Sequence, residues 1–258
     1  MSQRGNILLI VIVILVIIAG VIFLFTRNKA DTTRIPLPLN QSNSEDSENQ
    51  STFSFVNPKK SAHYESNTPK HGSTLVGVPV NVVIDFNFDL AKPSSISIMK
   101  ETAEYGVGET KIDVNKLAMR RDMNPNAPDG LYTVTYNACW PDGSCHDGSF
   151  QFAIDSKFSA NFNDMTDQNN VTIRMSGNTF EPMNIIINKG TKVTWVNDDS
   201  VEHFVNTDSH PAHTYEPKQN SQALSYGDSY SYTFEKPGIY PYHCSAHERV
   251  MKASILVR

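Results

Sequence analysis

The sequence predicts an all-β protein with two Greek-key β-sandwich domains in series after one N-terminal transmembrane helix. Three observations lead to this prediction. Beyond residue 62, short runs that alternate in polarity or are rich in β-branched and aromatic residues recur between Gly, Pro, Asn and Asp, as strands do between turns. Long helical periodicity is absent from this part of the sequence. One uninterrupted apolar run near the start is long enough to cross a bilayer.

The apolar run covers residues 7–25 and contains no charged residue. As a helix it would span about 28 Å, close to the hydrocarbon thickness of about 30 Å. A secretory signal has a shorter apolar stretch and a small-residue cleavage site, so we predict an uncleaved single-pass anchor within residues 1–29. A long signal peptide is the alternative. Arg27, Lys29 and Arg34 follow the run, and the positive-inside rule alone would keep the later domains in the cytoplasm.

Composition narrows the functions open to the rest of the chain. A net charge of −5 with 19% charged residues argues against a nucleic-acid binder. Three cysteines are too few for a four-thiolate zinc site or a four-cysteine iron–sulfur cluster. Residues 30–62 are polar and rich in Ser and Asn. We predict a disordered linker there, because such a stretch cannot bury enough apolar surface to offset its ordering entropy.

Strand signals divide the remaining chain into two domains, residues 63–156 and residues 171–258. Residues 157–170 lack these signals and are predicted to form a second linker. The predicted strands cover residues 80–88, 94–100, 131–140, 149–154, 171–175, 184–188, 192–197, 229–234, the strand-like run 238–243, and 254–258.

The residues with the strongest chemical signal lie in the second domain, in the motif Cys244-Ser-Ala-His247-Glu-Arg-Val-Met251. A thiolate, an imidazole and a thioether thus share one loop between two predicted strands. Soft sulfur ligands with imidazole suit copper, and two His, one Cys and a distant axial Met form the blue-copper arrangement. We expect the second imidazole from His203, which follows the predicted strand 192–197. Zinc could occupy the same ligands.

This part of the chain, about residues 171–258, resembles the cupredoxin family of plastocyanin, amicyanin and azurin. The resemblance implies a two-sheet sandwich that holds one type 1 copper through two histidines and Cys244, with Met251 as the axial ligand, and that passes single electrons. It also implies a structural role for Asn197. The residues that carry the resemblance are Gly190-Thr-Lys-Val-Thr-Trp-Val-Asn197, His203, Tyr242-His-Cys-Ser-Ala-His247 and Met251.

Two features depart from that family. Many members have Asn or Thr directly after the first histidine ligand, where it ties the two ligand loops together, but this sequence has Phe204. The segment between His203 and Cys244 is also long. It contains His210 and His213, which we expect to be exposed loop histidines.

A closed set of four protein ligands favours an electron carrier over an enzyme. Multicopper oxidases resemble this domain but have a His-Cys-His run and further His-x-His pairs, whereas Ser245 follows His243 and Cys244 here. A binuclear copper site of the Cu-A kind would need a second Cys at the position of Glu248. We therefore expect neither enzymatic activity nor a small-molecule substrate.

The first domain, residues 63–156, resembles the bacterial copper-resistance family CopC. The resemblance implies an Ig-like sandwich and a second copper site, for Cu(II), at His63 and His146. Because His63 is internal and Ser144 stands where that family has Asp, a structural spacer domain is the alternative. The matching segments are His63-Tyr-Glu-Ser-Asn-Thr-Pro69, Val80-Asn-Val-Val-Ile-Asp-Phe86 and Pro141-Asp-Gly-Ser-Cys-His146-Asp-Gly-Ser-Phe-Gln-Phe152.

Cys139 and Cys145 flank a five-residue turn sequence in the first domain. Its segment Pro141-Asp-Gly143 suits a three-residue hairpin loop with Gly in the left-handed position, so the two cysteines would face each other across two strands. We predict a disulfide, which would require an oxidising compartment. Free thiols, or metal ligands beside His146, are the alternative.

Together these features predict a membrane-anchored type 1 copper protein that carries single electrons outside the cytoplasm. We expect a single-pass cell-membrane protein with both β domains on the extracytoplasmic side. The predicted copper chemistry and disulfide favour this side, and we give them more weight than the positive-inside rule. The expected partners are larger redox proteins and, through the helix, the membrane; nucleic acid is not expected. The alternative is a copper-binding protein for buffering, delivery or resistance, which the CopC-like domain motivates.

Overall fold

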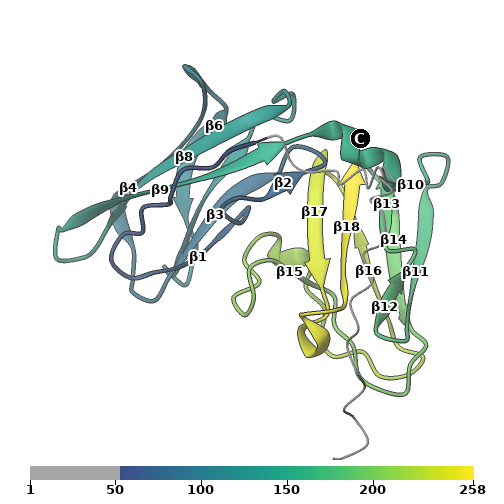
Figure 1. The fold of residues 1–258 in the computed structure, drawn as a ribbon. Helices are drawn as coiled ribbons and strands as arrows, with labels where there is room; N and C mark the ends of the chain where they lie inside the picture. The colour runs from purple at the N-terminus through teal and green to yellow at the C-terminus, as the bar shows by residue number, and fades with distance from the viewer. Residues whose placement is uncertain (1–52) are drawn as a thin grey trace, which may run out of the picture. The chain divides into compact units, whose positions relative to one another are not determined.

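The computed structural model describes residues 53–258. This part of the chain consists mostly of β-strands and the loops between them (Figure 1), in agreement with the predicted all-β class. The predicted anchor, residues 7–25, and most of the predicted first linker lie outside the described residues. Among residues 53–258, no helix is long and apolar enough to cross a membrane.

The first domain consists of two sheets around one apolar core, with strand orders β1-β3-β7-β6 and β2-β9-β8-β4-β5. In β8 the side chains of Tyr132, Val134 and Tyr136 are buried, and the residues between them are half-buried or exposed, so one face of the strand covers the core. The strands are β1 (Tyr64–Thr68), β2 (Thr74–Leu75), β3 (Asn81–Phe86), β4 (Ala91–Lys100), β5 (Ala103–Glu104), β6 (Gly106–Ile112), β7 (Ala118–Met123), β8 (Gly130–Cys139) and β9 (Cys145–Ile154).

The second domain also has two sheets, with strand orders β12-β11-β14-β16 and β10-β13-β18-β17-β15. Burial alternates strictly along β11, where Val171, Ile173 and Met175 face the core. Strands β17 and β18 run side by side and antiparallel (Figure 1). The strands are β10 (Asn163–Asp164), β11 (Asn170–Ser176), β12 (Thr179–Glu181), β13 (Asn184–Ile187), β14 (Lys192–Asn197), β15 (Asn206–Thr207), β16 (Ser229–Thr233), β17 (Gly238–His243) and β18 (Lys252–Val257).

Strand β3 contributes to the cores of both domains. All six of its residues are buried. Val82 and Ile84 belong to the core of the first domain, whereas Val83 between them belongs to the core of the second. Because successive side chains of a strand point to opposite faces, each face of β3 packs into a different core.

The two segments predicted as linkers contain more structure than expected. The second predicted linker, residues 157–170, contains most of the 3-10 helix Ser156–Asn161. Strand β10 follows this helix and pairs in parallel with β13. At the end of the first predicted linker, Lys59 forms a bridge with Ser149. These residues are therefore attached to the sheets by backbone hydrogen bonds.

The long segment between His203 and Cys244 contacts the first domain. The carboxylate of Asp85 on β3 is buried and accepts hydrogen bonds from the hydroxyls of Ser209 and Thr214, the latter at 2.6 Å. Arg120 on β7 also donates to the carbonyl of Thr214, at 2.8 Å. The extra residues in this segment therefore form part of the contact between the two domains.

Candidate metal centre

The proposed copper ligands lie where two loops of the second domain meet. His203 follows β14, and Cys244 comes directly after β17, before a short 3-10 helix, Ser245–His247. The amide of Cys244 donates to the carbonyl of Met251 at 3.0 Å, and the amide of Met251 donates to the carbonyl of His247 at 2.9 Å. These bonds fold the Cys-x2-His-x3-Met segment into a closed loop.

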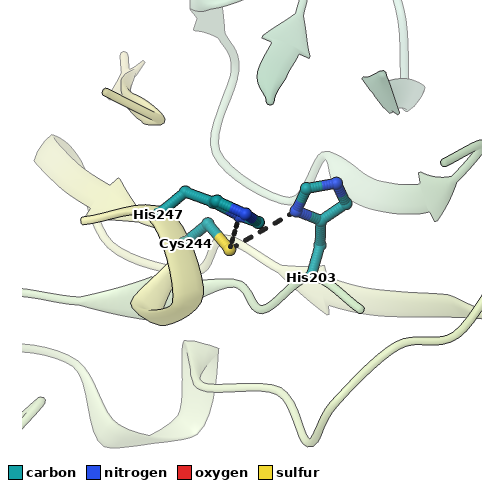
Figure 2. Close-up of side chains that lie close together, drawn as sticks. All are labelled: His203, Cys244 and His247. Carbon is teal, nitrogen blue, oxygen red and sulfur yellow. Dashed lines mark hydrogen bonds between the residues drawn. The ribbon is translucent and has the colours of Figure 1, made fainter. Parts of the chain in front are cut away.

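Three of the four predicted ligands bring their donor atoms together (Figure 2). The Sγ of Cys244 lies 3.5 Å from Nδ1 of His203 and 3.6 Å from Nδ1 of His247. A metal with bonds of about 2.0–2.3 Å would hold such donors about 3.6–3.8 Å apart. Cys244 and His203 have no exposed surface, and His247 is half-buried. The donor set and its spacing therefore fit a bound metal ion.

Met251, the predicted axial ligand, is completely buried in the same apolar core cluster as Cys244. Its backbone is bonded to both Cys244 and His247, as described above. Its assignment as the axial ligand stays a prediction.

Asp199 orients the His203 ring. Its carboxylate accepts a hydrogen bond from Nε2 of His203 at 2.8 Å. Because a carboxylate only accepts, Nε2 carries the proton and Nδ1 presents its lone pair toward Cys244. The hydrogen bond from His203, with one from the Gly177 amide, lowers the pKa of Asp199 and keeps it ionised. The sequence analysis missed this residue; its only signal was a carboxylate four positions before a histidine ligand.

The two ligand loops are tied together despite Phe204. The Phe204 amide donates to the Cys244 sulfur at 3.4 Å, a backbone bond that every residue except proline could make at this position. The side-chain tie comes from Asn206, whose Nδ2 donates to the hydroxyl of Ser245 at 2.7 Å. Asn197 has the structural role expected of it, because its Nδ2 donates to the carbonyls of Val201 and Leu224 in the loop around His203, at 2.8 Å each.

His210 and His213 are not simply two separate exposed histidines. His210 is exposed, but His213 is half-buried, and burial lowers the pKa of its imidazole. One nitrogen of each ring lies within 4.8 Å of the others and of a nitrogen of His243. The expectation of exposed loop residues is therefore wrong for His213, because the long segment folds back against β17.

In the first domain, His63 and His146 both lie near the ring of Trp140 and do not form part of a ligand cluster. Both are exposed, and their ring centroids lie 5.5 Å and 6.1 Å from that of Trp140. His63 also stacks on Phe88 and has its Nδ1 3.1 Å from Oδ1 of Asn87. Among residues 53–258, neither histidine belongs to a group of three side chains placed to hold a metal. The Cu(II) site stays a prediction.

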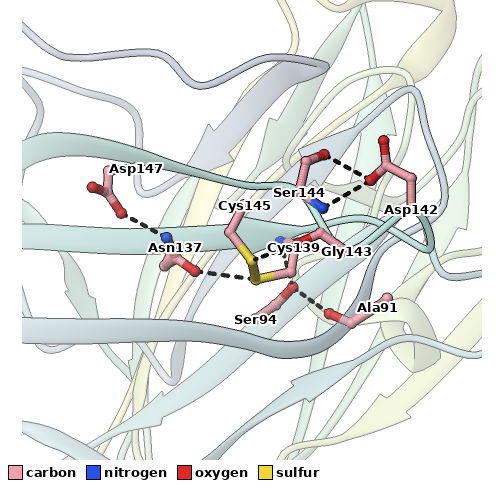
Figure 3. Close-up of a disulfide and its surroundings, with 9 residues drawn as sticks. All are labelled: Ala91, Ser94, Asn137, Cys139, Asp142, Gly143, Ser144, Cys145 and Asp147. Carbon is pink, nitrogen blue, oxygen red and sulfur yellow. Dashed lines mark hydrogen bonds between the residues drawn. A yellow bond between two sulfur atoms is a disulfide. The ribbon is translucent and has the colours of Figure 1, made fainter.

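Cys139 and Cys145 form the predicted disulfide (Figure 3). They are directly paired across β8 and β9. Gly143 in the connecting turn has a φ of 86°, the left-handed conformation expected there, and its amide donates to the carbonyl of Trp140 at 3.0 Å. Free thiols or metal ligation by these two cysteines are thereby excluded.

A two-sheet sandwich with buried Cys and His donors on adjoining loops defines a copper-binding protein of the cupredoxin class. Residues 167–258 match the family of copper-binding proteins of plastocyanin/azurin type, and residues 64–155 match the CopC domain. The chain belongs to the plastocyanin/azurin family through its C-terminal domain and has a CopC domain before it.

Individual proteins are similar to one part of the chain or the other. Plastocyanin of Scenedesmus fuscus is 32% identical over 100 residues, which cover 34% of this chain and 99% of the plastocyanin. A purple cupredoxin from Nitrosopumilus maritimus is 31% identical, with a TM-score of 0.29, over 34% of this chain and 99% of its own. CopC from Methylosinus trichosporium OB3b is 24% identical, with a TM-score of 0.33, over 37% of this chain and 94% of its own.

Proposed function

We propose that this protein is a type 1 copper protein that carries single electrons, held at the cell membrane by its N-terminal segment with both β domains outside the cytoplasm. One observation supports the copper centre above all others. A completely buried cysteine sulfur lies within 3.6 Å of a nitrogen of each of two histidines on different loops. Copper at this position would supply a one-electron change of oxidation state.

The surrounding residues suit electron transfer because they hold the donors fixed and keep water out. Asp199 fixes the ring of His203, and the Phe204 amide donates to the Cys244 sulfur. Four protein donors would leave no open position for a substrate, so we propose no enzymatic activity. His247 is the half-exposed member of the set, and its imidazole edge is the proposed route for electrons to a redox partner.

The disulfide between Cys139 and Cys145 supports the extracytoplasmic location, because disulfides persist in oxidising compartments. The predicted anchor, residues 7–25, would keep the domains near membrane redox proteins. We propose such proteins, rather than nucleic acid or a small molecule, as the partners.

Absorption spectroscopy of the copper-loaded chain tests this proposal. We expect an intense thiolate-to-copper band in the visible region that Cys244→Ser abolishes. Met251→Leu should keep the colour and change the reduction potential, because only the axial donor is lost. An unchanged spectrum in Cys244→Ser would show that Cys244 is not a ligand.

A copper-handling role, in buffering, delivery or resistance, is the second candidate, and the match of residues 64–155 to the CopC domain favours it. The same experiment separates the two functions. Stoichiometric copper binding without the intense band would favour handling, whereas the band together with reversible one-electron reduction would favour electron transfer.

A further inference from the structure

A second group of histidines lies beside the Cys244 centre and shares no residue with it. His243 ends β17, and its neighbour across the sheet is Asn206 of β15, after which the chain continues to His210 and His213. The three ring centroids are 5.1–5.5 Å apart. One nitrogen of each ring lies within 4.8 Å of the others. Three imidazole rings are therefore grouped closely on this side of β17.

The His243 ring has a nitrogen without a partner. The residue is 2% exposed, and its Nε2 is buried without a hydrogen-bond partner. Its Nδ1 lies 3.3 Å from the carboxylate of Asp208, to which it donates. Nδ1 therefore carries the proton, and Nε2 has a free lone pair. A buried polar atom without a partner is costly, and a metal ion would satisfy this one.

The other two rings can supply the remaining donors. The Nδ1 of His213 donates to the carbonyl of Thr207 at 2.9 Å, so its Nε2 has the lone pair. That atom lies 3.1 Å from the hydroxyl of Ser245, whose hydrogen bond a metal would replace. His210 is exposed, so its ring is free to rotate inward and gives an ion access from solvent.

We propose that His210, His213 and His243 form a second metal site that binds a divalent first-row ion through three imidazoles. Imidazole suits copper and zinc, and Cu²⁺ binds most tightly of these ions to a given nitrogen site. Bonds of about 2.0–2.1 Å require the nitrogens to lie closer than about 4.2 Å, which the exposed His210 ring allows. Asp208 is a positioning residue that fixes the tautomer of His243. None of these three histidines belongs to the ligand sets that the cupredoxin and CopC resemblances imply.

Copper counting by equilibrium dialysis, combined with electron paramagnetic resonance of the full chain, tests the site with Cu²⁺ alone as the probe. We expect a copper signal with splitting from several imidazole nitrogens in addition to the type 1 signal. His210→Ala, which changes an exposed side chain, should remove this second signal and one copper per chain while the type 1 band stays. Asp208→Asn should weaken the second site by about 10–100-fold.

His71→Ala is the matched control, because it removes a histidine that lies outside this group, outside the Cys244 centre and outside the predicted Cu(II) site at His63 and His146. It should leave the second signal unchanged. The proposal is overturned if the wild-type chain shows no second signal, if His210→Ala retains it, or if His71→Ala removes it. Loss of the blue band alone would count against the electron-transfer proposal and not against this site, because the two sites are read from different signals.

Discussion

The two β domains have similar architecture, but they differ in how they place histidines. In the C-terminal domain, His203 and Cys244 are completely buried and their donor atoms are 3.5 Å apart. In the CopC domain, His63 and His146 are both exposed and lie against Trp140. A family match thus extends to both domains, whereas among residues 53–258 only the C-terminal domain brings potential metal donors together in groups of three.

The largest difference between the two domains is expected when one histidine is removed from each and the copper band is compared. His203→Ala should abolish the intense copper band and weaken copper binding by more than the roughly 10–100-fold that follows loss of an outer partner. His63→Ala should leave the band unchanged, because this ring lies in the other domain, against Phe88 and Asn87. Copper titration monitored by absorption compares the two variants. A reduced copper affinity in His63→Ala would show that the CopC domain also binds the ion.

A smaller loss of copper affinity is expected when Asp199, the hydrogen-bond partner of His203, is replaced. Asp199→Asn removes the anionic acceptor of the Nε2 proton and should weaken copper binding by about 10–100-fold. Asp198→Asn is the matched control, because Asp198 pairs with Arg174 on the surface instead. Competition with a copper chelator measures both variants. Equal affinities would show that Asp199 does not position the ring.

A disulfide links two strands of the CopC domain, whereas the cysteine of the C-terminal domain, Cys244, is free. Replacing Cys139 and Cys145 together by Ser should lower the free energy of unfolding by about 2 kcal/mol, because the link closes a short loop. Chemical denaturation measures the change, and the copper band reports on the other domain. A shift of that band would show that the disulfide also shapes the metal centre.

The smallest effect concerns a surface carboxylate of the CopC domain. Burial favours the neutral form of Glu104, but hydrogen bonds from Ser97 and from the amides of Ile98 and Gly106 outweigh it and lower the pKa. A folded-state pKa below the unfolded value of about 4.3 stabilises the fold above that pH, and the contribution is lost as the pH falls through the folded-state pKa.

Glu104→Gln should therefore lower the melting temperature slightly at pH 7 and have less effect near pH 3. The change is small because solvent screens this partly exposed side chain. Glu109→Gln, at an exposed position on β6, removes the same charge and serves as the control. An equal difference from wild type at both pH values would contradict the assigned cause.

The parts of the site that depend on the spacing of residues close in sequence could be predicted from the sequence. The Cys-x2-His-x3-Met loop lies between two strands that could be predicted, and Cys139 and Cys145 flank a turn whose Gly143 sets the geometry. Residues whose role depends on distant chain segments were missed. Asp199 matters because it meets the His203 ring, and Asn206 because β15 pairs beside Ser245. Neither contact follows from composition or periodicity.

The convergence of His210, His213 and His243 was missed for the same reason. In the sequence, His243 is the end of a predicted strand region, and the other two are loop residues about thirty positions earlier. They meet because the long segment returns to β17, as the ring separations show. A loop of this length has no periodic pattern from which its path could be predicted.

The double burial of β3 also limits how this protein can evolve. Val83 packs into one core and its neighbours Val82 and Ile84 into the other, so a shift of this strand that adjusts one core also moves side chains of the other. Exchange of either half for a homologue by recombination would leave a mismatched surface at β3. The two halves are therefore expected to be inherited together, with compensating substitutions across their boundary.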